Sequence, residues 1–466
     1  MTRDELRQRL ASPMSHPDVG EMSRMADAVR DWSIHFHSTL SDSPVGRRAT
    51  PDEIDRKLPT DFAETGQPFD DVLEVFTQSI APFSFPPDHP RFVAFIGSAA
   101  TFPAIVGDWL ATAANFFTGV WAESAGPSAV EQSVLELVRE WLGMPPSTRG
   151  VLTSGGSEAN LTALAVARDG IAFEDRSRLV LYTSDQRHRS VDRAAMILGL
   201  SPERVRILPT DSDFRLDPAT LTSAIAEDLR VGLIPWAMVA HAGTTNTGAV
   251  DPLDTVAGIA AERGIWLHVD AAYGWPLILS DRRGSLSGID RADSVTFDPH
   301  KWFAQPYEVG GLLVRDGPRL TRTFRTRSEY MTDVESADDS EVDFADRGIS
   351  LSRRCRALKI WFSLKVLGVG WFRELIERNC LHAEYAEVCL REAGFEVVAR
   401  NASIVCFRHP KLDDDGHARL IERVHATGEM FLSSTRLRGR RVLRMCFINW
   451  RTTAGDVERM VRLLCE

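Results

Sequence analysis

The sequence has no long apolar run. Its N-terminus, MTRDELRQRLASPMSHPDVGEM, lacks the uninterrupted apolar core of a secretory signal, and no stretch of about 18 apolar residues could span a bilayer. We therefore expect a cytoplasmic protein with no membrane partner. With 466 residues, of which 44% are hydrophobic and 26% charged, the chain is long enough to bury a large core in two or three domains.

Cysteine is scarce, and positive charge is in deficit. The six cysteines all lie in the last quarter of the chain, with no CxxC pair and no histidine spacing typical of zinc, so we expect free thiols and no metal. The net charge of -11 argues against a nucleic-acid partner. One basic run, RLRGRRVLR at 436–444, could contact a polyanion, but its alternation with Leu and Val fits a half-exposed strand better.

Short apolar runs alternate with amphipathic stretches between residue 151 and about residue 316. This alternation predicts an α/β fold with a large, mostly parallel sheet and helices on both faces. Helical patterns such as ANLTALAVAR, SVDRAAMILG and DTVAGIAAER separate several of the runs. The strands are expected at 151–154, 179–184, 236–243, 265–270, 294–297 and 310–315.

The sequence predicts three parts. Residues 1–85 are polar, rich in proline and helix-like in places, and cannot easily form a core alone. A large α/β domain is expected over 86–365. Helical patterns followed by strand-like runs predict a small α+β domain over 366–466. Between the sheet and this ending, residues 326–348 are acidic and without a clear period, which is typical of a mobile loop.

In an open parallel sheet, ligands bind beyond the carboxyl ends of the strands, so the residues after each run are informative. The first such segment holds Ser154, Gly155, Gly156 and Ser157 between a strand and a helix. Small residues there free backbone N–H groups and the helix dipole to hold a phosphate. A Gly-Gly turn that only caps the helix is the alternative. The segment lacks the GK[ST] ending of a Walker loop.

Asp270 ends the run IWLHVD, where burying a carboxylate is costly unless a cation or a proton meets it. A pyridine N–H is such a partner, and an aspartate there keeps the ring protonated and therefore a strong electron sink. The alternative is an aspartate that caps the next turn. Ala272, two residues further on, is small enough for a flat ring to lie against it.

Lys301 follows the run SVTF in the segment SVTFDPHKW. A desolvated lysine forms imines with aldehydes, whereas a lysine extended over the surface past Trp302 is the alternative. His188 and the pair Thr244 and Thr245 follow two further strands, although a lone histidine more often has a structural role. Together the five strand ends suit the phosphate, ring nitrogen, aldehyde and ring faces of pyridoxal 5'-phosphate (PLP).

These residues also carry a family resemblance. The sequence resembles the group II PLP-dependent amino-acid decarboxylases, which have the type I aspartate-aminotransferase fold and include the aromatic-amino-acid decarboxylases. The resemblance covers nearly the whole chain. It rests on HPRFVAFIGSAATFPAIVGD, TSGGSEANLTAL, YTSDQRHRSVDRAA, GTTNTGAVDPL, HVDAAYGW, DPHKWF, SRRCRALKIWF and LRMCFINWRTT.

The resemblance implies a role for each matching residue. Lys301 would be the Schiff-base lysine, His188 would stack on the ring opposite Ala272, and Tyr330 in the acidic loop would protonate the carbanion left by carbon dioxide. The implied PLP-binding set is Gly156, Ser157, His188, Thr245, Asp270, Ala272, His300 and Lys301. The family also implies a homodimer with shared active sites, and residues 1–85 would pack on the partner subunit.

The implied substrate pocket departs from that of the aromatic enzymes. Its predicted residues are Phe95, Ser98, Asp298 and Ser352, and Asp298 stands where those enzymes have an asparagine. Pro87, Gly97 and Gly119 replace larger or stiffer residues, which predicts a wider pocket for a bulky or polar side chain.

We therefore expect decarboxylation of an L-amino acid to its amine and carbon dioxide, through an imine that replaces the bond to Lys301. One alternative keeps the cofactor but couples carbon dioxide loss to oxygen, giving an aldehyde, ammonia and peroxide. A β-eliminating lyase is another. A non-catalytic binding protein would be expected to have lost Lys301 or Asp270, and both are present.

Overall fold

The structure is a computed structural model that describes residues 1–59, 62–326 and 341–466. It has two compact units, Met1–Pro86 and Pro87–Glu466. The further division of the second unit at residue 365 stays a prediction. The long helix α12, Ala357–Glu392, crosses that position and is interrupted at Gly368, whose φ is 76°. None of the described helices combines the length and the apolar character that crossing a membrane needs.

The first unit is helical. Its longest helix, α2, starts at an Asp18 cap that is closed by Glu21 in a capping box, and it pairs with α4 through Arg24 and Asp70. Trp32 and Phe76 add an edge-to-face ring contact at 4.9 Å. The elements are α1 (Arg3–Arg9), α2 (Val19–Thr39), α3 (Pro51–Asp55), α4 (Phe69–Val75), the π-helix η2 (Phe76–Ile80) and the 3-10 turns η1 (Leu40–Asp42) and η3 (Ala81–Phe83).

The second unit is built on a seven-stranded sheet of order β1-β7-β6-β5-β4-β2-β3, in which only β7 runs antiparallel to its neighbours. The α/β prediction is confirmed. The expected strands all formed, and β3 is an additional edge strand whose sequence, VRIL, is only four residues long. The strands are β1 (Arg149–Thr153), β2 (Leu179–Ser184), β3 (Val205–Leu208), β4 (Ile234–His241), β5 (Trp266–Asp270), β6 (Ser294–Phe297) and β7 (Gly310–Val314).

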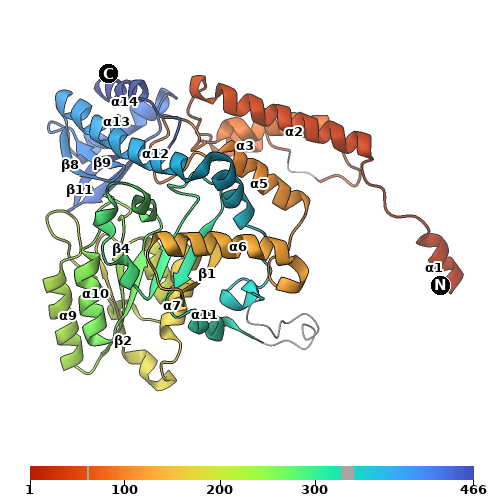
Figure 1. Ribbon diagram of the computed structural model, residues 1–466. Coiled ribbons are helices and arrows are strands. Elements are labelled where there is room, and N and C mark those ends of the chain that lie inside the picture. Colours follow the sequence, from red (N-terminus) through yellow and green to blue (C-terminus); the bar gives the residue numbers. More distant parts are fainter. Residues whose placement is uncertain (60–61, 327–340) are drawn as a thin grey trace. The chain divides into compact units, whose positions relative to one another are not determined.

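Helices cover both faces of this sheet (Figure 1). Crossovers between parallel strands are right-handed, so the face on which a helix lies depends on the direction in which the chain steps across the sheet. The steps through α7 and α8 lead from β1 to β2 and on to the edge strand β3, which places both helices on one face. The steps through α9 and α10 lead back from β3 to β4 and β5, which places these two helices on the other face. The helices before and within the sheet region are α5 (Phe102–Ala113), α6 (Trp121–Trp141), α7 (Gly156–Arg168), α8 (Arg189–Ile197), α9 (Pro218–Arg230), α10 (Leu253–Arg263) and α11 (Gly317–Phe324).

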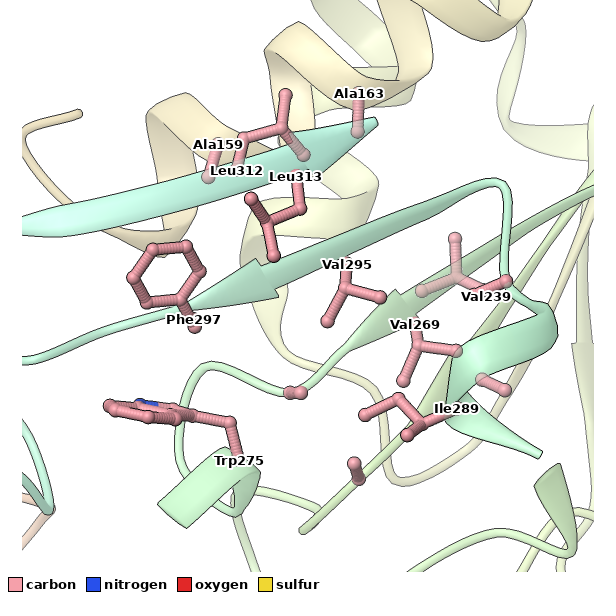
Figure 2. Packing of buried hydrophobic residues seen from close by; sticks show 14 of the residues in the cluster. Ala159, Ala163, Val239, Val269, Trp275, Ile289, Val295, Phe297, Leu312 and Leu313 are labelled. Carbon is pink, nitrogen blue, oxygen red and sulfur yellow. The ribbon is translucent and has the colours of Figure 1, made fainter. Parts of the chain in front are cut away.

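The core lies between these layers. Figure 2 shows Ala159 and Ala163 of α7 facing β7, whose Leu312 is fully buried. Small residues let the helix approach the strand closely. On the other side of β6, Trp275 and Phe297 make an edge-to-face contact at 5.6 Å. Each large apolar side chain buried in this way contributes about 1.5–3 kcal/mol, so the packing fixes where the strand ends lie.

A second, four-stranded antiparallel sheet of order β10-β11-β9-β8 lies in the C-terminal part of the unit, packed by α12, α13 and α14 (Figure 1). The basic run at 436–444 spans the turn of the hairpin β10–β11, as a strand-forming run predicts, but it is not half-exposed throughout, because Val442, Leu443 and Arg444 are all buried. All six cysteines are free thiols. The elements are β8 (Glu396–Asn401), β9 (Ile404–Arg408), α13 (Asp414–Ala426), β10 (Ser433–Leu437), β11 (Arg440–Cys446) and α14 (Ala454–Cys465).

Candidate active site

A cavity of about 380 Å³ lies at the carboxyl ends of strands β1, β2, β4, β5 and β6. The parallel sheet explains the convergence, because its strand ends meet at one edge. The lining contains these residues predicted from the sequence: Gly156, Ser157, His188, Thr245, Asp270, Ala272, Asp298, His300 and Lys301.

The turn from β1 to α7 forms a cradle of backbone N–H groups. Gly155 has φ 154° and ψ 179°, a conformation that is almost restricted to glycine, and a Cβ there would lie 3.0 Å from Cε1 of His300. The next N–H, of Gly156, donates to Oδ2 of Asp298 at 3.0 Å. Ser154 turns away and donates to Glu158 from both its backbone nitrogen and its hydroxyl, at 2.8 and 2.7 Å. The cradle is thus an anion-binding helix start that a carboxylate already engages.

Asp270 is buried at the end of β5, and Asn160 of α7 holds it. Nδ2 of Asn160 donates to Oδ2 of Asp270 at 2.9 Å, and the Ala272 N–H donates to Oδ1 at 3.2 Å. Burial alone raises the pKa of the Asp270 carboxyl, but His241, Lys301 and the Asn160 hydrogen bond outweigh it and leave the pKa below its ordinary value. Asp270 is therefore a carboxylate, ready to accept a hydrogen bond from a cationic ring N–H.

Lys301 lies between two carboxylates. Its Nζ is 3.1 Å from Oδ2 of Asp298, and burial, which lowers the pKa of the ammonium, is outweighed by the charges of Asp298 and Asp270, which raise it. The side chain is partly exposed to the cavity. A lysine amine held inside a concave site by its own strand-end loop is positioned to react with an aldehyde that enters there.

Two histidines of the cavity are held in fixed orientations. Nδ1 of His188 lies 2.8 Å from the Ser190 hydroxyl at the start of α8, and Nδ1 of His300 accepts the Val309 N–H at 3.1 Å. The Val309 bond leaves Nε2 as the protonated nitrogen of a neutral His300 ring. Burial lowers the pKa of both imidazoles, so both rings are mainly neutral at neutral pH.

A second cavity of about 330 Å³ shares Ile96, His188, Thr245 and Lys301 with the first. Its remaining lining is mostly polar and comes from three parts of the chain: Phe95, Asn246, Ser433, Ser434, Thr435 and Arg444. Arg444 of β11 is 4% exposed and donates to the backbone oxygens of Asn246 and Phe95 at 3.0 and 2.7 Å, while its Nη2 has no hydrogen-bond partner. This buried guanidinium therefore places a positive charge at the wall of the second cavity, with an Nη2 amino group that has no protein partner.

Sequence reasoning missed Asn160 and Arg444. Asn160 stands within the motif TSGGSEAN, one helical turn after Gly156, and that spacing was the available signal. Arg444 ends the basic run at 436–444, but nothing in that run distinguishes it from the other arginines, because only the packing of the second sheet brings β11 to the cavity.

The other predicted pocket residues that the structure describes do not line the first cavity. Phe95 lines the second cavity with a φ of 53°. Ser98 is buried and Ser352 is exposed, and neither is in the lining of these two cavities. Tyr330 lies outside the described residues. Its role and those of Ser98 and Ser352 stay predictions.

The residues present fit PLP. The cavity offers an amine at Lys301, a buried carboxylate at Asp270 for the ring nitrogen, and the N–H groups of the α7 start for the phosphate. Ala272 and His188 are both in the lining, as the two faces of a flat ring require. The unsuited feature is Asp298, a second carboxylate against the cradle.

Comparison with known proteins identifies the family. The model of the pyridoxal-dependent decarboxylase conserved domain matches residues 51–410. An aromatic-L-amino-acid decarboxylase of Bacillus atrophaeus is 37% identical, with 94% of this chain and 93% of the relative covered. A phenylacetaldehyde synthase of Arabidopsis thaliana is 31% identical, covering 94% and 93%. The crystal structure of Oryza sativa TDC with PLP and tryptamine superposes with a TM-score of 0.91 at 30% identity, covering 97% and 98%.

The match with the family model extends over most of the chain and includes every strand of the large sheet. The predicted fold, cofactor and reaction class are thereby confirmed. The chain belongs to the pyridoxal-dependent decarboxylase family and is a PLP-dependent amino-acid decarboxylase.

Proposed function

We propose that the chain decarboxylates a large L-amino acid with a polar tip on its side chain, giving the amine and carbon dioxide. The observation that carries this proposal is the pair of joined cavities around Lys301. The first holds the amine and the two carboxylates, and the second continues from it with Phe95 as an aromatic wall and with hydroxyl, amide and guanidinium groups. Those hydroxyl and amide groups already bond to neighbouring groups, as the Thr435 hydroxyl does to Asn246 at 2.7 Å, and they offer a polar tip further hydrogen bonds that a bare apolar side chain could not make.

We assign the cofactor contacts as follows. The phosphate would be held by the cradle at Gly156 and Ser157 together with His300, and the ring nitrogen by Asp270. Thr245 would lie near the ring hydroxyl, and Ala272 and His188 would cover the two faces. When bound, PLP supplies an electron sink for the electron pair that remains on Cα after carbon dioxide leaves.

Residues of the chain orient the Asp270 carboxylate, contact the substrate and move protons. Asn160 keeps the Asp270 carboxylate oriented, so the charge that holds the ring nitrogen protonated is fixed before the substrate arrives. Arg444 places positive charge at the wall of the second cavity, where it favours an acceptor on the substrate. Lys301 and His188 line both cavities and are therefore placed to move protons at the reacting carbon. Tyr330, predicted as the proton donor to that carbon, lies outside the described residues.

The test is a product analysis. The purified protein with PLP is incubated with a panel of L-amino acids, among them tyrosine, tryptophan, phenylalanine and glutamate, while carbon dioxide, ammonia and peroxide are followed together. Amine and carbon dioxide in equal amounts, with tyrosine or another polar-tipped substrate preferred over phenylalanine, are expected. Preference for phenylalanine would contradict the substrate proposal. Lys301→Ala is expected to lose the visible absorbance band of lysine-bound PLP, and an unchanged band would refute the assignment of that lysine.

A second candidate is oxidative: loss of carbon dioxide followed by reaction with oxygen to give an aldehyde, ammonia and peroxide. The similarity to the Arabidopsis thaliana phenylacetaldehyde synthase favours it. Two residues argue for the non-oxidative outcome. The family resemblance implies that aldehyde-forming members carry phenylalanine at the position of Tyr330 or asparagine at that of His188, and this sequence keeps both residues. Ammonia and peroxide in the same assay would establish the oxidative reaction, and their absence would exclude it.

We further propose that the enzyme works as a homodimer. Helix α5 exposes Phe102, Trp109 and Leu110, and a row of large apolar side chains on one helix is typical of an interface. Sedimentation equilibrium tests the dimer, and a monomer at micromolar concentration would contradict it. The packing of residues 1–85 on the partner, the cytoplasmic location and the absence of a membrane partner stay predictions from the sequence.

A further inference from the structure

Asp298 lies at the junction of the cradle and Lys301. Its carboxylate is 1% exposed, and Oδ2 accepts the Gly156 N–H at 3.0 Å and faces Nζ of Lys301 at 3.1 Å. Nε2 of His300 is a more distant neighbour, 3.8 Å from the same oxygen. The other oxygen, Oδ1, has no hydrogen-bond partner. The carboxylate thus occupies a backbone donor of the only glycine-rich anion cradle that the described residues of this cavity form.

The surrounding backbone holds this carboxylate in place. A Cβ on Gly310 would lie 2.5 Å from Oδ1, and a Cβ on Gly156 would lie 3.0 Å from Oδ2. Both glycines therefore give the room that the carboxylate fills. Because the side chain is short and enclosed on these two sides, Asp298 cannot move far from an anion that enters the cradle.

The charges around the cradle do not offset a further anion. Lys301 is the one lysine in the cavity lining described here, and it faces Asp298 and also interacts with Asp270. Burial lowers the pKa of His188 and His300, so neither ring supplies a full positive charge at neutral pH. Of the remaining ionisable groups, Tyr307 is neutral because burial raises its pKa, and Glu308 is paired with Arg356 at 3.0 Å. Burial lowers the pKa of His241, but Asp251 outweighs burial and raises it, and that carboxylate, 3.2 Å from Nδ1, pairs with the ring. A phosphate that binds the cradle therefore lies beside a carboxylate whose neighbouring ammonium, that of Lys301, is shared with Asp270.

We propose that Asp298 is the resident anion of the cradle and weakens binding of the cofactor's phosphate group, so that the enzyme exchanges PLP with solution more readily than the same site with a neutral side chain. This inference rests on the proposed placement of PLP. Two effects act together. The phosphate must displace the carboxylate from the Gly156 N–H, and like charges at this separation repel strongly where water is excluded.

The test compares cofactor affinities of the cofactor-free enzyme and its Asp298→Asn variant, measured by titration of the visible absorbance and of tryptophan quenching. Asparagine keeps the shape and a hydrogen-bonding oxygen but removes the charge. We expect the dissociation constant for PLP to fall by about tenfold or more, and that for pyridoxal, which lacks the phosphate, to change by less than about threefold. Inorganic phosphate should compete with PLP at lower concentration in the variant.

Equal PLP affinities of the two proteins would overturn the proposal. So would an equal gain for PLP and pyridoxal, since that result would place the effect on Lys301 instead of on the phosphate. Asp298→Ser serves as a second neutral variant if the asparagine protein does not fold. Asp293→Asn is the matched control, because Asp293 is a carboxylate at the opposite end of β6 that accepts the Leu267 N–H at 2.8 Å, and its loss should leave PLP affinity unchanged. Failure of the unmodified enzyme to bind PLP at all would instead contradict the proposed function.

Discussion

Asn160 connects the Asp270 carboxylate to the core, and removing its side chain should lower the free energy of unfolding. Its amide makes four hydrogen bonds to Asp270, Ser190, His268 and Thr296, at 2.9, 2.8, 3.0 and 2.8 Å, and the residue is 1% exposed. Asn160→Ala leaves each of these buried groups without one partner. The bond to the Asp270 carboxylate is charge-assisted and accounts for about 1.5–3 kcal/mol, and the neutral ones for about 1 kcal/mol each before partial relaxation.

We therefore expect Asn160→Ala to lower the free energy of unfolding by about 3–5 kcal/mol. Urea denaturation of the cofactor-free protein, followed by tryptophan fluorescence, measures this change, because Trp266 and Trp275 are buried in the folded protein and become exposed on unfolding. Thr162→Val is the matched control on the same helix. The Thr162 hydroxyl is bonded only to the Glu158 carbonyl at 2.8 Å, so that variant should lose about 1 kcal/mol or less. A loss below about 1 kcal/mol for Asn160→Ala would refute the view that Asn160 joins these groups.

Three further predictions concern stability and the cradle. Gly155→Ala places a Cβ against His300 at a position whose backbone conformation is almost restricted to glycine. The affinity for PLP, measured by absorbance titration, should therefore fall by about tenfold. An unchanged affinity would show that the cradle tolerates a Cβ. Arg353→Met should lower the free energy of unfolding by about 3–5 kcal/mol, because it leaves Glu131 buried without its partner at 2.6 Å. The double variant with Glu131→Leu should recover part of that loss in urea denaturation, and no recovery would contradict the pairing. Burial lowers the pKa of His268 to about 4 in the folded chain, whereas the ordinary pKa of about 6.5 applies in the unfolded chain. Between these two pH values only the unfolded chain binds a proton at His268. The free energy of unfolding should therefore fall by on the order of 3 kcal/mol as the pH is lowered from about 6.5 to 4. His268→Gln should make that fall shallower, and an identical pH profile would show that His268 is not its source.

Much of the fold could be predicted from local patterns. The apolar runs became strands of the large sheet because a strand buried on both faces needs a continuous apolar sequence. Strand β3 could not be predicted, because Arg206 and the other partly exposed residues of an edge strand carry no such pattern. The strand at β7 was predicted but its antiparallel direction was not, since a run such as GGLLVR is equally apolar in either direction.

Some features of the candidate site could likewise be predicted from the sequence, and others depend on the tertiary structure. The sequence by itself determined that Lys301, Asp270 and the glycine-rich turn each follow a strand, and the parallel topology then required that they meet, because strand ends of one direction share an edge. Only the tertiary structure decided that Asp298 turns into the cradle, that Asn160 faces Asp270, and that Arg444 reaches the cavity from the second sheet. Those contacts depend on side-chain direction and on how distant segments pack, and neither is encoded in the spacing of residues along the chain.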